Sequence, residues 1–226
     1  MSSISWLPIV ASVWAVSLPA VTVRADDNGT GFEAGLRAGY AIPLGKIRGN
    51  SNTDLNDGIT GQIPLWLDVG YRAVPELFVG LYGQYGFGFV PKSGCGSGVD
   101  CSAVDTRLGV QVHIHPAPES SADGWLGIGF GYEWMTVNAS GMGVEVSGTL
   151  HGIELLNLQA GVDIKVAENF RVGPTLSFSL GQYGATSITC SSSAGGCGPI
   201  TDQSDSISNK ALHEWLFFGV RGVYGP

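Results

Sequence analysis

Apolar and polar side chains alternate, residue by residue, in eight separate segments of this chain. In Phe32–Leu44, one set of alternate positions holds Phe, Ala, Leu, Tyr and Ile, and the other holds Glu, Gly, Arg and Ala. A period of two is that of a β-strand, whose successive side chains point to opposite faces. The pattern therefore predicts eight two-faced strands. The segments are Phe32–Leu44, Gly61–Arg72, Phe78–Val90, Val104–His115, Trp125–Val137, Leu150–Val166, Phe170–Tyr183 and Lys210–Gly225.

The connections between these segments alternate in length. Residues 45–60, 91–102, 138–149 and 184–209 form the longer connections, and residues 73–77, 116–124 and 167–169 form the shorter ones. Barrels of the outer membrane have short periplasmic turns and longer outer loops. The chain is therefore predicted to be all-β, a transmembrane antiparallel up-and-down β-barrel of eight strands with long outer loops, short periplasmic turns and both ends of the barrel chain on the periplasmic side.

The composition fits a membrane barrel better than a soluble protein. Only 13% of the 226 residues are charged, whereas about a quarter are charged in a typical soluble domain. After residue 25 no apolar run approaches the roughly 18 residues that a spanning helix needs. The net charge of −8 argues against nucleic acid as a partner, because phosphate binding requires clustered Lys and Arg.

The N-terminus has the pattern of an export signal. An apolar stretch from Ile4 to Val23 ends in the small-x-small site Val23-Arg24-Ala25, just before polar residues. This pattern predicts a signal peptide over residues 1–25 and an outer-membrane barrel domain over residues 26–226. The alternative is an uncleaved anchor, because the first residues lack Lys and Arg.

The four cysteines fall into two local pairs in Gly- and Ser-rich connections. Cys95 and Cys101 lie in one connection, and Cys190 and Cys197 lie in another. Of the three possible connectivities, the two local bridges close the shortest loops and cost the least chain entropy. We expect both bridges to form on the outer side. Zinc is the competing interpretation, but neither pair has a Cys-x2-Cys spacing or a neighbouring His.

The polar face of the strands is predicted to line a closed lumen. It is rich in Gly, Ser and Thr with charges of both signs, whereas the water-facing surface of a soluble barrel would be rich in Lys and Glu. The alternative is a soluble lipocalin-like barrel with its apolar face inward. Five acids against six bases would pair inside the lumen, since an unpaired buried ion costs several kcal/mol. The predicted network is Glu33, Arg37, Asp68, Arg72, Asp105, Arg107, Glu133, Asp163, Lys165, Arg171 and Arg221.

Other side chains suggest chemistry only weakly. His113 and His115 share a face and are more consistent with a hydrogen-bonded pair than with a metal site. Residues 52–58 resemble a calcium loop, but its Gly falls one position late. His151 and His213 are the central candidates for a catalytic triad. The possible partners in sequence are Ser147, Glu154 and Glu214. We expect no cofactor, no metal and no catalytic site.

Two short pieces and the last strand carry a family resemblance. The pieces are Glu168-Asn169-Phe170-Arg171-Val172-Gly173-Pro174 and Gly127-Ile128-Gly129-Phe130-Gly131-Tyr132, and the last strand alternates through Leu216, Phe218, Val220 and Gly222 toward Tyr224. Over Gly31 to Tyr224 the chain resembles the small eight-stranded outer-membrane β-barrel family that includes the OmpA, OmpX and OmpW barrel domains. The resemblance implies a bacterial outer-membrane location and a last strand that the barrel-assembly machinery reads.

The predicted function is a structural, surface-interaction or adhesive role through disulfide-clipped outer loops. The alternatives are a narrow channel for small solutes and a lipid-modifying enzyme. The expected partners are outer-membrane lipid, the assembly machinery and an extracellular ligand that the sequence does not identify. We expect the protein to be a monomer.

Overall fold

The computed structural model describes residues 29–49, 54–91, 95–96, 98–141, 143–192, 197 and 203–226. The predicted signal peptide lies outside these residues. No helix among them is long and apolar enough to cross a membrane. The elements are β1 (Gly31–Gly45), α1 (Leu55–Gly58), β2 (Gly61–Val74), β3 (Leu77–Phe89), β4 (Asp100–Ile114), β5 (Ala122–Gly141), β6 (Val144–Ala167), β7 (Phe170–Ser192), β8 (Gln203–Ser206) and β9 (Leu212–Tyr224).

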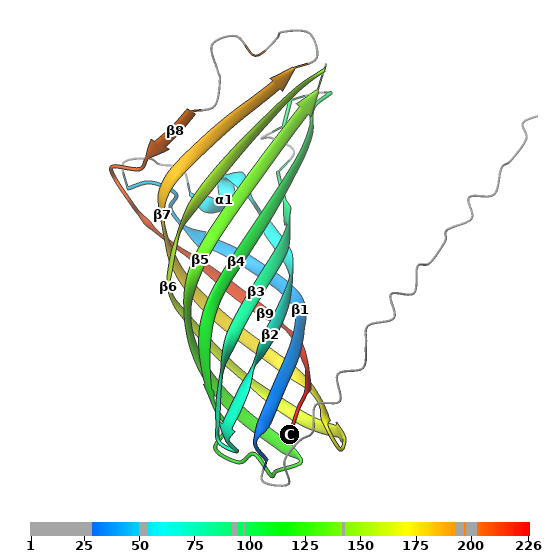
Figure 1. The fold of residues 1–226 in the computed structure, drawn as a ribbon. Helices are drawn as coiled ribbons and strands as arrows, with labels where there is room; N and C mark the ends of the chain where they lie inside the picture. Colours follow the sequence, from blue (N-terminus) through cyan, green and yellow to red (C-terminus); the bar gives the residue numbers. More distant parts are fainter. Residues whose placement is uncertain are drawn as a thin grey trace, which may run out of the picture.

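Eight of the strands form a closed antiparallel ring, as the alternation predicted. Strands β1 to β7 pair in chain order, β7 pairs with β9, and β9 pairs with β1 to close the ring. The C-terminus lies at one end of the barrel and α1 lies toward the other (Figure 1). A closed ring satisfies the backbone hydrogen bonds of every strand, which a membrane requires.

The two faces of the wall point as predicted. Apolar side chains of alternate residues project outward and are strongly exposed, including Leu36 (65%), Leu81 (58%) and Leu126 (64%). The polar positions between them point inward and are buried, as Arg37 (1%) and Asp68 (1%) illustrate. Because the exposed face is apolar and the buried face is polar, this barrel is built to sit in lipid.

Four strands, β4 to β7, extend beyond the predicted membrane segments at the outer end, and this differs from the expectation. Residues 138–149 were expected to form a loop, but β5 and β6 remain paired up to Gly141 and Val144. Strand β7 continues to Ser192, and the short β8 pairs with it inside the expected loop 184–209. The apolar alternation ends at the membrane boundary, whereas strand pairing continues in water through Ser- and Thr-rich sequence. One side of the barrel is therefore taller than the other (Figure 1).

The first outer connection folds into the mouth of the barrel and fills it. Its α1 segment and the residue after it contribute Leu55 and Ile59, each 2% exposed, and a second connection contributes Ile207 at 4%. These side chains pack with the inward-facing Met135 and Trp215 in one hydrophobic cluster. We call Leu55, Ile59 and Ile207 the apolar plug.

Candidate functional site

The structure places most of the predicted lumen charges inside the barrel. Arg171 lies partly buried at the periplasmic mouth, with 13% of its side chain exposed. Lys165 is exposed, and its assignment to the buried network is wrong, because the last residues of β6 extend past the packed lumen. The buried members, each 2% exposed or less, are Glu33, Arg37, Asp68, Arg72, Asp105, Arg107, Glu133, Asp163 and Arg221.

On the periplasmic side, two arginines share one carboxylate. Arg72 Nη2 lies 2.6 Å from Glu33 Oε2, and Arg221 Nη2 lies 2.9 Å from Glu33 Oε1. Arg221 also pairs with Asp163, and its guanidinium lies 4.7 Å from the ring centroid of Trp125. Each guanidinium is therefore matched by carboxylate oxygens, which offsets the cost of removing it from water.

The next layer along the barrel axis is a bidentate ion pair. Arg37 donates from Nε and Nη2 to the two carboxylate oxygens of Asp68 at 2.6 and 2.7 Å. Gln111 accepts a third hydrogen bond from Arg37 at 2.9 Å and donates to Asp68 at 2.9 Å. A planar guanidinium bound in this way fixes the relative positions of β1, β2 and β4.

Nearer the outer side, a single arginine faces three carboxylates. Arg107 lies 3.0 Å from Asp105, 3.4 Å from Glu133 and 3.2 Å from Glu154. Neutral side chains also donate hydrogen bonds to these carboxylates. Gln84, for example, donates to Asp105 at 2.7 Å. Arg107 is thus the cation on which this outer-side cluster depends.

A stacked pair of rings completes the outer-side cluster. The Tyr183 hydroxyl donates to Glu133 Oε1 at 2.7 Å, and His213 Nε2 lies 2.8 Å from Glu133 Oε2. The rings of Tyr183 and His213 stack at 4.0 Å between centroids and 8° between planes. These aromatic rings fill the lumen between the ion pairs and the apolar plug.

Glycines in the wall make room for Tyr82, which crosses the lumen to reach Glu154. A Cβ atom at Gly131 would lie 2.6 Å from the Tyr82 hydroxyl, and one at Gly109 would also collide with the ring. The hydroxyl donates to Glu154, to which Ser179 also donates. Small residues on β4 and β5 therefore position a large polar residue of β3.

Sequence reasoning missed two buried carboxylates. Asp123, which binds Arg171 at 3.0 Å, lies two residues before the predicted segment and could have been found by extending its alternation. Strict alternation along β6 would point Glu154 outward, so the sequence suggests for it only the part of a triad partner. A bulge between Glu154 and Leu156 shifts the alternation and turns the carboxylate inward. The expected excess of bases is therefore wrong: among the described residues, seven buried carboxylates face five arginines.

The histidines pair with polar groups and do not gather into a metal or triad site. His113 Nε2 lies 3.0 Å from Gln159, and His115 Nδ1 lies 2.7 Å from Asp123. Among the described residues, no group of three or more His, Cys, Asp or Glu is placed to hold a metal ion. His151 bonds Tyr132 at 2.6 Å, away from the buried His213.

Residues 52–58, which weakly resemble a calcium loop, are described by the structure from Asp54 onward, and one of their acids caps a helix. Asn52 lies outside the described residues. The Asp57 carboxylate accepts a hydrogen bond from the backbone N–H of Asp54 at 2.9 Å, which caps α1. One acid of the pattern thus stabilises the short helix that carries Leu55 of the plug.

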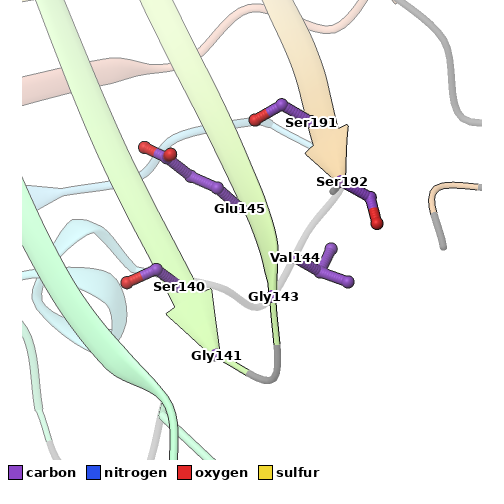
Figure 2. Close-up of a pocket in the computed structure, with 7 residues that line it drawn as sticks. All are labelled: Ser140, Gly141, Gly143, Val144, Glu145, Ser191 and Ser192. Carbon is purple, nitrogen blue, oxygen red and sulfur yellow. The ribbon is translucent and has the colours of Figure 1, made fainter. Parts of the chain in front are cut away.

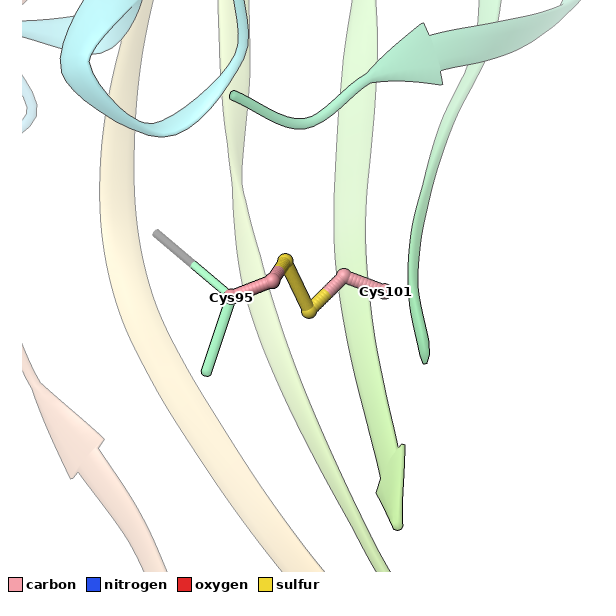
Figure 3. The surroundings of a disulfide bond; sticks show 2 residues. All are labelled: Cys95 and Cys101. Carbon is pink, nitrogen blue, oxygen red and sulfur yellow. A yellow bond between two sulfur atoms is a disulfide. The ribbon is translucent and has the colours of Figure 1, made fainter. Parts of the chain in front are cut away.

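Both local disulfides form, as the spacing predicted. Cys95 bonds Cys101 with 6.3 Å between Cα atoms (Figure 3), and Cys190 bonds Cys197 with 5.8 Å. Cys101 lies in β4 and Cys190 in the extended part of β7. Each bridge therefore ties a connection to a strand that rises above the membrane.

The tall side of the barrel ends in a hollow lined by Ser140, Gly141, Gly143, Val144, Glu145, Ser191 and Ser192. The hollow has a volume of about 400 Å³ and lies where the β5–β6 turn meets the end of β7. Figure 2 shows Glu145, Ser140 and Ser191 pointing to the same side, and Val144 pointing away. This surface carries hydroxyl groups and one carboxylate.

Comparison with known proteins supports the fold. No sequence family matches the chain, and no curated protein sequence is a recognisable relative. Neisserial surface protein A is similar in structure, with a TM-score of 0.52 and 14% identity over 87% of this chain and 99% of that one. A major outer membrane protein from Thermus thermophilus has a TM-score of 0.57 and 10% identity over 86% and 98%. Identities this low show the fold alone.

The barrel and its apolar outer face define the class of protein. The chain has the fold of the small eight-stranded outer-membrane β-barrel proteins. The solved structures that share this fold include a major outer membrane protein of a bacterium, and the apolar side chains exposed on the outer face of this chain are those that a lipid-facing wall requires.

Replacing Arg107 by Met tests the outer-side cluster. Three buried carboxylates would lose their shared cation, so we expect the free energy of unfolding to fall by about 3 to 5 kcal/mol. Urea unfolding in lipid vesicles, followed by tryptophan fluorescence, measures the loss. Lys165→Met is the matched control, because this exposed cation lies outside the packed lumen, and its effect should stay within about 0.5 kcal/mol. Equal effects of the two changes would refute the assigned role of Arg107.

Proposed function

We propose that the protein is a non-conducting outer-membrane barrel that presents an extracellular sheet to external molecules. The observation that carries this proposal is the filled lumen beneath a wall that is taller on one side. The barrel provides a rigid support, and the outer ends of β5, β6 and β7 provide the interaction surface. The role is therefore structural and surface-interacting, with adhesion as its expected form.

The filling of the lumen supports the absence of a solute path. Ion pairs around Arg221, Arg37 and Arg107 occupy successive levels of the barrel. Above them, Trp215 and Tyr183 are buried at 2% and 0% exposure, and the apolar plug lies over both. Eight strands enclose a space that side chains just fill, and here long polar and aromatic residues fill it.

The outer sheet has the chemistry of a binding surface. Its strands carry Ser and Thr hydroxyls and acids such as Glu145 and Asp205, both exposed. The Cys190–Cys197 disulfide ties β7 of this sheet to the connection that follows it, and so short a bridge contributes on the order of 2 to 3 kcal/mol of local stability. A rigid polar surface loses little entropy when it binds a partner.

The proposal includes the partners that the sequence suggested. The apolar outer face would contact outer-membrane lipid, and the alternating last strand, β9, would be read by the assembly machinery. We propose that the barrel functions as a monomer, since its ring is closed by its own strands. The extracellular ligand is defined only as a molecule that hydroxyls and carboxylates can bind.

Conductance across planar bilayers tests the filled lumen. We expect no steady single-channel conductance from the inserted protein, because the ion pairs and the plug leave no water-filled path. Heat-modifiable migration in gels controls for correct folding of the protein that is added. A steady conductance would overturn the proposal and favour the narrow-channel alternative.

Trimming the outer sheet tests its role in binding. Residues 139–146 would be replaced by Asn-Gly, a two-residue hairpin turn that fits between the paired Asn138 and Ser147. We expect wild-type protein in nanodiscs to bind members of an array of extracellular glycans and matrix proteins, and the trimmed barrel to lose this binding. Lys165→Met, on the opposite side, should bind as the wild type does. Wild-type binding no greater than that of empty nanodiscs, or unchanged binding after trimming, would contradict the proposal.

A further inference from the structure

The negative charge buried in the lumen is not spread evenly along the barrel. On the periplasmic side and in the next layer, carboxylates and guanidinium groups are equal in number and pair with one another. They are Glu33, Asp68, Asp123 and Asp163 with Arg37, Arg72, Arg171 and Arg221. In the outer-side cluster, Arg107 is the only described guanidinium that pairs with Asp105, Glu133 and Glu154. Among the described residues, the whole excess of buried carboxylates therefore lies in this cluster.

Histidine does not remove this shortage of positive charge. His213 Nε2 lies 2.8 Å from Glu133 Oε2, so a proton on the His213 ring would add one positive charge to the cluster. Three carboxylates would still face two cations. An uncompensated charge in a buried site is strongly unfavourable. The cluster therefore requires a further proton or a bound cation.

Hydrogen bonds show which carboxyl group of the cluster can carry a proton. Glu154 accepts hydrogen bonds at both oxygens, and both oxygens of Glu133 also have partners. Asp105, which is 1% exposed, accepts at Oδ2 from Arg107 at 3.1 Å and from two glutamines. Asp105 Oδ1, in contrast, is buried without a hydrogen-bond partner among the described residues. Asp105 is therefore the carboxyl group with a free position for a proton.

The side chain of Gln62 is placed to pair with a protonated Asp105. Gln62 Nε2 donates to Asp105 Oδ2 at 2.8 Å, whereas Gln62 Oε1 is a second buried atom without a partner among the described residues. Gln62 Oε1 lies against the wall at Gly86, the residue opposite Asp105 on β3. A Cβ atom at Gly86 would collide with Gln62 Oε1 and would lie 3.3 Å from the Asp105 carbonyl oxygen. The amide of Gln62 therefore lies beside Asp105 with one unused acceptor.

A proton on Asp105 Oδ1 would satisfy both unpartnered oxygens. A protonated carboxyl group has one O–H donor and keeps an acceptor at its other oxygen, which complements the donor and acceptor of a primary amide. The Oδ1–H group would donate to Gln62 Oε1 while Gln62 Nε2 continues to donate to Oδ2. Because a buried acceptor without a donor is unfavourable, the proton stabilises the amide as well as the charge balance.

The other strands bring charged and titratable groups toward Asp105. They are Arg37 of β1, Tyr82 of β3, Arg107 of β4, Glu133 of β5, Glu154 of β6, Tyr183 of β7 and His213 of β9, whereas β2 contributes the neutral Gln62. Arg37 is bound to Asp68, and each tyrosine donates to a glutamate. Among the described cations, Arg107 alone lies within salt-bridge distance of Asp105.

We propose that Asp105 and Gln62 form a proton-binding site in the lumen. Under mildly acidic conditions Asp105 is a carboxylic acid paired with the Gln62 amide, although a solvent-exposed aspartate is ionised there. Raising the pH removes this proton and leaves an uncompensated negative charge beneath the apolar plug. The stability of the filled lumen is thereby coupled to pH.

Infrared difference spectroscopy tests for the proton directly. Wild-type protein and Asp105→Asn are folded in lipid vesicles, and the C=O stretch of protonated carboxyl groups is compared at about pH 5.5 and about pH 8.5. We expect a carboxylic acid band in the wild type at the lower pH that disappears at the higher pH and is absent from the variant. Glu145→Gln, which removes an exposed carboxyl group, is the matched control and should keep the band. Identical spectra of the wild type and Asp105→Asn would overturn the proposal.

A variant of Gln62 tests the pairing with the amide. Gln62→Met keeps a similar side-chain length but removes the amide donor and acceptor. We expect the carboxylic acid band to move to higher frequency, because a C=O group that loses a hydrogen-bond donor vibrates at higher frequency. Heat-modifiable migration checks that the variant folds. A band at the wild-type frequency in folded Gln62→Met would overturn the assigned role of Gln62.

The pH dependence of stability provides a second measurement. Asp105 is ionised in the unfolded chain over this pH range, whereas the folded protein binds the proton. The unfolding equilibrium constant of the wild type should therefore rise with pH, by up to about tenfold per pH unit. Asn offers the same donor and acceptor as a carboxylic acid, so Asp105→Asn should be at least as stable as the wild type at the higher pH, with a weaker pH dependence.

Two results of these stability measurements would contradict the proposal. Lower stability of Asp105→Asn throughout the pH range would mean that ionised Asp105 is the stabilising partner of Arg107. A bound metal cation is the other possible source of positive charge, so the unfolding temperature is also measured with Ca²⁺ and with a chelator. We expect neither addition to change it. Stabilisation by Ca²⁺ that Asp105→Asn lacks, without a carboxylic acid band, would assign the site to a metal cation and overturn the proton.

Discussion

Charge pairing inside a closed wall is the constraint on which this structure depends. A β-barrel in lipid turns its apolar residues outward, so the polar face of every strand is directed into a space with little room for water. Each buried ion then requires a partner. Arg37 with Asp68 and Arg107 with Glu133 supply these partners between consecutive strands, and Arg221 with Glu33 supplies one between the last strand and the first. The ion pairs thus fix how the strands meet around the ring.

The same constraint accounts for the wall glycines and the plug. Long arginines and aromatic rings fit inside an eight-stranded ring only where neighbouring wall positions are small, and Gly109 and Gly131 fulfil this role beside Tyr82. At the outer end the charges give way to Trp215, Leu55 and Ile59. This change from charged to apolar filling closes the lumen without leaving an ion at the water boundary.

The sequence predicted the faces of the wall better than the ends of its strands. Strict alternation placed Arg37, Asp68 and Arg107 inside because their strands run without interruption through the membrane. Alternation failed at Glu154, where a bulge inserts one residue and turns the side chain from the outer face to the inner face of the wall. Such a bulge depends on the pairing partner as well as on the local sequence. Alternation also failed at the outer ends of β4 to β7, where the apolar pattern stops but hydrogen bonding continues. The apolar plug was not predicted, since only three-dimensional packing brings Leu55 and Ile207 together.

A double-mutant cycle on the Arg37–Asp68 pair tests the central claim most directly. Arg37→Met and Asp68→Leu are made separately and together, and unfolding free energies are measured in lipid vesicles. If pairing in the lumen holds the fold, each single change leaves a buried charge without its main partner, and the double change removes both charges. The sum of the two single losses of unfolding free energy should then exceed the loss in the double variant by about 2 kcal/mol or more. Additive losses would contradict the claim, because the two charges would then act independently.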